Sequence, residues 1–125
     1  MTRKILIAAN WKMNKTVKES LSFINEFKSL IKTNNEIVIA PPFTALEEAK
    51  KAIKNAGIKL AAQNMHQEEE GAFTGEISAG MVKELAEYVI LGHSERRQFF
   101  GETNKLINKK IQTALKHKLK VILCI

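Results

Sequence analysis

Two groups of polar side chains stand directly after short apolar runs, where they could carry out chemistry. Asn10 and Lys12 follow the first such run, and His93 and Glu95 follow the fourth. A lysine ammonium could neutralise an anionic substrate or a developing oxyanion. A histidine at the start of a helix, where the helix dipole disfavours the imidazolium, could donate a hydrogen bond to a substrate carbonyl. Taken singly, each residue also fits a structural role, so these four are candidates for a site.

The residues that follow His93 favour a helix start. Ser94 is a plausible N-cap, which would place His93 at the N-terminus of a helix. Glu95 could form an ion pair with Lys12 or with one of the two arginines that follow it. The other two histidines of the chain fit structural roles better, because one lies in a loop and the other at a lysine-rich helix end.

The composition is that of one soluble, folded domain. Of the 125 residues, 45% are hydrophobic and 26% are charged, which excludes a disordered tail. No apolar run reaches the roughly 18–20 residues of a membrane span, and the first run is shorter than the roughly 7–15 residues of a signal-peptide core. We therefore expect no membrane association and a cytoplasmic location. The lone Cys124 allows neither an internal disulfide nor a cysteine-rich metal site.

The charge is basic, with 20 Lys and Arg against 13 acids, and every acid is Glu. A chain without Asp cannot use the Asp pairs that hold Mg²⁺ in many phosphotransfer sites. The basic residues are scattered and have no interleaved aromatics, which argues against a nucleic-acid surface. The net charge of +7 could still attract an anionic substrate.

Five β-like runs alternate with four helix-like stretches, which predicts parallel βα repeats of the α/β class. The runs occupy residues 5–9, 36–40, 60–64, 88–91 and 121–125. They are almost continuously apolar, as strands are when both faces of a parallel sheet are covered. Thr16 and Thr44 each fit a capping box, Ser78 and Thr103 are further N-caps, and Gly57 is a natural stop for the second helix.

One connection is longer than the others. Residues 65–77 form a loop of 13 residues with two glycines and Phe73, which we expect to be exposed. Loops of this length are usually lids, binding loops or interface arms. We expect residues 67–70 to be solvated and residues 71–75 to dock against another surface.

The candidate residues place a condition on the sheet. The first and fourth strands of a flat sheet lie about 14 Å apart, at roughly 4.8 Å per step, with side chains pointing in parallel directions. Curling the sheet turns these side chains toward a common axis. Lys12 and His93 can therefore act on one small substrate only in a barrel-like arrangement.

Five segments, in order and at matching spacing, resemble the N-terminal half of the triosephosphate isomerases, and the resemblance covers the whole chain. The segments are Asn-Trp-Lys-Met-Asn at 10–14, Ala-Pro-Pro-Phe-Thr at 40–44, Ala-Gln-Asn at 62–64, Gly-Ala-Phe-Thr-Gly-Glu-Ile-Ser at 71–78 and Leu-Gly-His-Ser-Glu-Arg-Arg at 91–97. The implied fold is the N-terminal half of a TIM (β/α)8 barrel, from the first βα unit to the fifth strand.

The resemblance implies interconversion of dihydroxyacetone phosphate and glyceraldehyde 3-phosphate through an enediolate, in glycolysis and gluconeogenesis, with no metal or cofactor. Asn10 and Lys12 would bind the substrate, and Lys12 would neutralise the phosphate and enediolate charge. His93 would polarise the carbonyl and transfer protons between the two oxygens. Glu95 would position Lys12, and Ser94 would anchor the segment that carries His93.

The resemblance also implies a homodimer through the loop at 65–77. This loop would enter a pocket of the second subunit and bring Thr74 close to that subunit's Asn10 and His93. The implied interface residues are Met13, Phe73, Thr74, Gly75 and Glu76.

Such a barrel needs about eight βα units over roughly 250 residues, whereas residues 1–125 hold four units and a fifth strand. None of the glutamates matches the family's catalytic base, and the closing lid and the glycine-rich phosphate loops have no counterpart. We therefore expect residues 1–125 to form a partial barrel domain. Alone it would be inactive and would aggregate or self-associate, and it would require a complementing C-terminal half.

Two other interpretations remain open: an open-sheet binding domain, and a non-catalytic half-barrel that uses its arm for assembly. A receiver-type phosphoacceptor domain is excluded, because the chain has no Asp. A nucleotide-binding sheet would need a glycine-rich turn after the first strand, and residues 10–15 contain no glycine.

Overall fold

The computed structural model describes residues 2–125, and the fold in this range is an alternation of strands and helices. In chain order the elements are β1 (Leu6–Asn10), α1 (Val17–Leu30), β2 (Glu36–Ala40), α2 (Phe43–Ala52), β3 (Ile58–Ala62), α3 (Ala79–Leu85), β4 (Tyr88–Leu91), α4 (Ser94–Phe99), α5 (Asn104–Lys116) and β5 (Lys120–Leu123).

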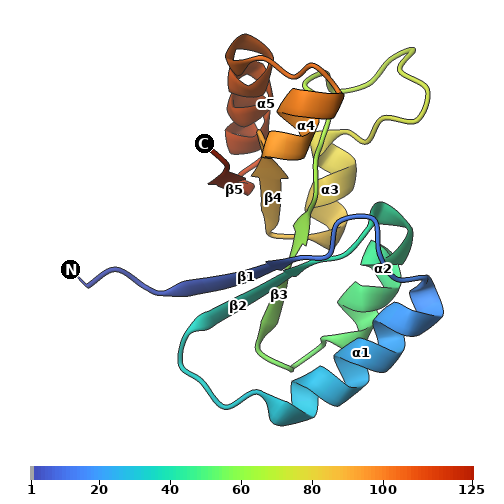
Figure 1. The fold of residues 1–125 in the computed structure, drawn as a ribbon, viewed down its shortest axis with the longest axis vertical. Helices are drawn as coiled ribbons and strands as arrows, with labels where there is room; N and C mark the ends of the chain where they lie inside the picture. Colours follow the sequence, from blue (N-terminus) through green and yellow to red (C-terminus); the bar gives the residue numbers. More distant parts are fainter. Residues whose placement is uncertain (1) are drawn as a thin grey trace.

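The sheet has the order β1-β2-β3-β4-β5, and all neighbours are parallel. It is strongly curled, so that β1 and β4 run in very different directions while the helices lie along its outer side (Figure 1). Parallel strands twist relative to one another, and this twist accumulates across the sheet. The predicted class, the N-terminal half of a TIM barrel, is confirmed.

The two faces of the sheet hold separate apolar cores. Ile39, Leu60 and Val89 point outward and pack with residues of the covering helices, such as Leu46. The alternate residues point inward and form a second cluster: Val38, Ala40, Ala61, Tyr88 and Ile90. Apolar side chains on both faces explain why the strands read as continuous apolar runs.

The two outermost strands are covered least. Within residues 2–125, β1 pairs only with β2, and β5 pairs only with β4. Ile7 of β1 is 49% exposed and Leu123 of β5 is 46% exposed. Each of these strands therefore presents one edge whose backbone groups are free to pair with another strand.

Helix starts follow local signals in three of the five predicted cases. Thr16 forms the capping box with Glu19, and Ser78 and Thr103 accept hydrogen bonds as N-caps. The capping box at Thr44 is wrong. The helix α2 begins at Phe43, two residues earlier than a cap at Thr44 would give, and its N-cap is Pro42, which forms no side-chain hydrogen bond.

The remaining differences concern element boundaries. The helix α2 ends at Ala52, and residues 53–57 form a turn in which Asn55 and Gly57 have positive φ, so Gly57 ends the turn and not the helix. The strand β3 therefore begins two residues earlier than predicted, and Gln63 and Asn64 lie beyond its end. The short helix α4 is separate from α5 and follows the helix start predicted near Ser94, so five helices stand where four helical stretches were predicted in residues 2–125. No helix in residues 2–125 has the length and apolar character to cross a membrane.

Gly92, which links β4 to α4, is a position where a side chain should be costly. Its φ is +75°, and an added Cβ would lie 2.9 Å from Arg97 Nη2 and 3.2 Å from the Cys124 carbonyl oxygen. Gly101 has a similar φ of +66° with nothing within 4 Å of an added Cβ. We expect Gly101→Ala to cost about 1 kcal/mol of unfolding free energy from backbone strain alone. Gly92→Ala should lower the unfolding free energy by about 1–3 kcal/mol more than Gly101→Ala does, because its Cβ also overlaps Arg97 and the Cys124 carbonyl.

Urea unfolding of the two variants, with residues 1–125 completed by a C-terminal half, measures this difference. Equal losses for Gly92→Ala and Gly101→Ala would contradict the tight packing around Gly92.

Candidate active site

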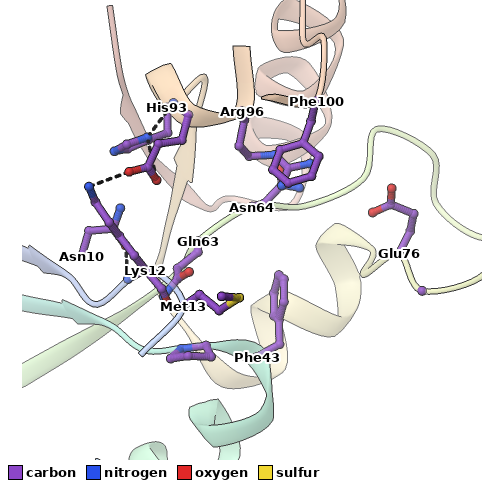
Figure 2. A pocket seen from close by; sticks show the side chains of 13 residues that line it. Asn10, Lys12, Met13, Phe43, Gln63, Asn64, Glu76, His93, Arg96 and Phe100 are labelled. Carbon is purple, nitrogen blue, oxygen red and sulfur yellow. Dashed lines mark hydrogen bonds and ion pairs between the residues drawn. The ribbon is translucent and has the colours of Figure 1, made fainter. Parts of the chain in front are cut away.

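A cleft of about 390 Å³ opens where the strands end and the loops toward the helices begin. Figure 2 shows side chains from the β1–α1 loop, the end of β3, the loop at 65–77 and the start of α4 around it. The carboxyl ends of parallel strands are where ligands bind in α/β folds. The lining residues are Asn10, Lys12, Met13, Pro42, Phe43, Gln63, Asn64, Gly75, Glu76, His93, Glu95, Arg96 and Phe100.

Lys12 is held in an unusual backbone conformation. Its φ is +55°, which is uncommon for a residue other than glycine. Asn10 Oδ1 accepts a hydrogen bond from the Lys12 N–H at 2.9 Å, and Gln63 Nε2 donates to the Lys12 carbonyl at 3.0 Å. Gln63 Nε2 also donates to the Ala40 carbonyl at 2.8 Å, which ties Lys12 to the end of β2. Both peptide groups of Lys12 are therefore fixed.

The Lys12 ammonium forms an ion pair with Glu95. Nζ of Lys12 lies 2.6 Å from Glu95 Oε1, and this contact joins the loop after β1 to helix α4 (Figure 2). The hydrogen bond from Lys12 holds the pKa of the Glu95 carboxyl below its usual range. Of the two partners considered for Glu95, the structure has Lys12 and not an arginine, because Arg96 pairs with Glu102 and Arg97 donates to Gly92 and Asn104.

His93 itself caps helix α4, and the assignment of Ser94 as N-cap is wrong. Nδ1 of His93 accepts a hydrogen bond from the Glu95 N–H at 3.1 Å, while Ser94 is the first helical residue. A ring nitrogen thus replaces the hydroxyl that usually satisfies this amide. In the neutral imidazole, an accepting Nδ1 places the proton on Nε2. His93 can therefore donate a hydrogen bond from Nε2.

Glu95 lies between the two candidate groups. Its Oε1 contacts Lys12, and its Oε2 lies 3.5 Å from His93 Nδ1. The cleft thus combines the Lys12 ammonium and the ring N–H donor of His93, and Glu95 lies against both residues. Such a pair can bind an anion and polarise a carbonyl of the same small molecule.

A buried ionic cluster lies beneath the cleft, and the sequence patterns did not predict it. Lys110, only 4% exposed, donates to Asn64 Oδ1 and to Glu102 Oε2, both at 2.9 Å, and Arg96 also donates to Glu102. Burial raises the pKa of the Glu102 carboxyl, but the hydrogen bonds from Arg96 and Lys110 outweigh it and keep the pKa below its usual range. The cluster fixes Arg96 and Asn64 at the cleft wall.

The loop at 65–77 is folded upon itself and anchored at its base. Phe73 packs on the ring of His66 with centroids 4.2 Å apart, and Phe73 remains 43% exposed. Thr113 of α5 donates to the Gln67 carbonyl at 2.8 Å. Glu69 is not merely solvated as expected, since its Oε2 lies 2.6 Å from His117 Nε2. Gly75 and Glu76 reach the cleft, and Thr74 and Met13 are exposed near it.

Within residues 2–125, no group of three or more His, Cys or acidic side chains is placed to hold a metal ion. Phe100, which packs on the guanidinium of Arg96, lines the cleft although no sequence pattern singled it out.

The ion pair between Lys12 and Glu95 has a measurable consequence. Replacing Lys12 by Met should raise the pKa of the Glu95 carboxyl toward its ordinary value, because the hydrogen bond that favours the carboxylate is lost. An NMR pH titration of the Glu95 side-chain carboxyl carbon measures the shift. Lys15→Met is the matched control, since Lys15 lies over the Trp11 and Phe23 rings. An unchanged Glu95 titration in Lys12→Met would refute the pairing.

Comparison with known proteins assigns the chain to a family. A family model described as triosephosphate isomerase matches residues 5–125. The triosephosphate isomerases of Alkaliphilus metalliredigens and Dictyoglomus turgidum are 60% and 58% identical to the chain, over 98% and 100% of its length and 50% and 51% of their own. That of Aquifex aeolicus is 54% identical over 96% of the chain and 50% of its own length. The chain spans about half the length of these relatives. A match that includes all five strands and both groups of candidate residues shows that the chain belongs to the triosephosphate isomerase family.

Proposed function

We propose that residues 1–125 form the N-terminal half of an isomerase that interconverts dihydroxyacetone phosphate and glyceraldehyde 3-phosphate through an enediolate, in cytoplasmic glycolysis and gluconeogenesis. The observation that carries the proposal is the joint placement of Lys12 and His93 around Glu95 at one cleft. The relatives are named triosephosphate isomerases, which supports an isomerisation of a triose phosphate.

In this proposal the site residues act on one small phosphorylated carbonyl compound. The Lys12 ammonium balances the phosphate and the enediolate charge, and Asn10 contributes a side-chain amide to the same substrate. His93 donates from Nε2 to the carbonyl oxygen and moves protons between the two oxygens. Glu95 positions Lys12 through the ion pair, and we assign to Ser94, the first residue of α4, the anchoring of the segment that carries His93.

We assign the base that removes the carbon-bound proton to a part of the enzyme outside residues 1–125. Glu76 and Glu95 are the carboxylates that line the cleft in the described part of the chain. Glu95 is held by Lys12, which lowers its pKa and makes it a poor proton acceptor. Glu76 lies on the loop across the cleft from His93 (Figure 2). We therefore assign the base, the lid and the phosphate loops to a complementing C-terminal half.

We also propose a homodimer through the loop at 65–77. The exposure of Met13 and Phe73 at the edge of the cleft supports this proposal, since large exposed apolar side chains around a site often mark an interface. The arm at Phe73–Glu76, whose tip is residues 73–75, would enter the cleft region of the second subunit.

A non-catalytic half-barrel that assembles through the same loop is the second candidate. The exposed edges of β1 and β5 favour it, because both can pair with further strands. The two candidates differ in whether isomerase activity appears once the barrel is complete.

The catalytic assignment can be tested in a hybrid in which residues 1–125 are joined to the half of the Alkaliphilus metalliredigens relative that the chain does not match. We expect the hybrid to be an active isomerase. Replacing His93 by Gln should lower kcat at least about 100-fold, because the donor to the carbonyl is lost. Replacing His117 by Gln, outside the cleft, should leave kcat within about twofold.

Steady-state kinetics in both directions measure these values. An active hybrid in which His93→Gln behaves like His117→Gln would refute the role of His93, and a folded but inactive hybrid would favour the non-catalytic candidate.

The interface assignment predicts the mass of the hybrid. Deleting the tip at 73–75 should halve the mass found by sedimentation equilibrium, because the arm no longer reaches the second subunit. Glu68→Gln, in the same loop but outside the tip, should leave a dimer. A dimer that survives the deletion would show that the subunits associate through another surface.

A further inference from the structure

The inner face of the sheet carries a layer of charged and polar side chains at the end opposite the cleft. Glu36 and Lys120 are the first residues of their strands, and they share the inward direction of Val38 and Ile122. Together with residues beside them, they form a connected layer, which we call the basal layer. Its members are Lys4, Glu36, Lys59, Tyr88 and Lys120.

Glu36 is the centre of the basal layer. Its carboxylate accepts a hydrogen bond from the Tyr88 hydroxyl and lies 3.0 Å from both Lys4 Nζ and Lys59 Nζ. Its side chain is only 8% exposed. The hydrogen bonds from Tyr88, Lys4 and Lys59 lower the pKa of Glu36 to about 2, and burial together with Glu36 raises that of Tyr88 to about 12. Glu36 is therefore ionised and Tyr88 neutral at physiological pH.

Among the described residues, Lys120 has no acidic partner. Its Nζ lies 5.3 Å from the centroid of the Tyr88 ring, and no carboxylate of residues 2–125 lies within ion-pair distance of it. The basal layer thus contains three ammonium groups, from Lys4, Lys59 and Lys120, and one carboxylate. The charges of these five side chains sum to +2, and the nearby Glu87 carboxylate, which also raises the pKa of Tyr88, accepts a hydrogen bond from the Leu60 N–H.

A closed barrel would bury this surplus of positive charge. The interior of an eight-stranded barrel is filled by layers of side chains contributed by its own strands. A charge enclosed there without a partner is strongly destabilising, so it must be paired or displaced. Acidic side chains from the strands that complete the layer can supply the missing charge.

We propose that the half-barrel that closes this sheet is recognised by charge as well as by shape: its strands place inward-facing carboxylates in the basal layer, and one of them pairs with Lys120. The inference rests on the proposed complementing half, and it adds the chemistry that such a partner must carry. It also assigns the two ends of the barrel interior separate tasks, with substrate chemistry at the cleft and recognition of the second half at the basal layer.

The hybrid described above tests the pairing through its stability. Lys120→Met keeps the length and apolar character of the side chain but removes the ammonium, and it should lower the folding equilibrium constant at least about tenfold, since the carboxylate is left buried alone. Lys120→Arg keeps the charge and should recover most of the loss. Lys109→Met, on the exposed side of α5, is the control and should change the constant less than about twofold.

Amide replacement then identifies the acidic residue that pairs with Lys120. Each acidic residue near the start of a closing strand is changed to its amide, alone and together with Lys120→Met. For the carboxylate that pairs with Lys120, the double variant should lose much less than the sum of the two single variants. The same measurements at 0 and 20 mM phosphate distinguish a side-chain carboxylate from a free anion.

The outcomes separate the inference from the proposed function. A stable hybrid in which Lys120→Met equals Lys109→Met, or in which no acidic position couples to Lys120, overturns the inference while isomerase activity still tests the function. A loss that appears only with phosphate also overturns it, in favour of a bound free anion. A stable hybrid that shows the coupling but no isomerase activity refutes the function and supports the inference. A hybrid that does not fold counts against both.

Discussion

The curl of the parallel sheet is the constraint on which the rest of the structure depends. It turns the ends of β1 and β4 toward a common axis, so that Lys12 and Glu95, from loops after different strands, meet at 2.6 Å. In a flat sheet of the same order these loops would lie side by side without converging. The same curl gives the sheet a concave face, where Val38, Ala61 and Ile90 pack against one another without any help from the helices. The curl of the sheet thus produces both the candidate site and the inner apolar core.

Local signals predicted much of the fold. The apolar runs marked all five strands, and Thr16, Ser78 and Thr103 marked helix starts, because a capping bond is formed between residues close in sequence. The prediction for Thr44 failed because the helix begins at Phe43, directly after Pro42, so that Thr44 already lies inside the first turn. The candidate residues after β1 and β4 were also found, since their position at strand ends is itself a sequence pattern.

Contacts between distant residues could not be predicted in this way. Lys110 resembles any lysine of a basic helix, and only the packing of α5 against the sheet shows that it is buried beside Glu102 and Asn64. Gln63 was predicted to lie at a strand end, but its hydrogen bond to the Lys12 carbonyl was not predicted. Lys12 has a positive φ, and a lysine in the sequence does not indicate that conformation. The cap formed by His93 was missed because serine is the commoner residue for that task.

That cap links two properties that are usually independent. The hydrogen bond from the Glu95 N–H to His93 Nδ1 both starts α4 and decides which ring nitrogen carries the proton. Loss of this hydrogen bond would leave Nδ1 without the donor that fixes the neutral tautomer of the ring. The hydrogen-bonding role of the ring is therefore tied to the order of the main chain in the first turn of α4, so that one backbone amide links helix formation to the chemistry of the cleft.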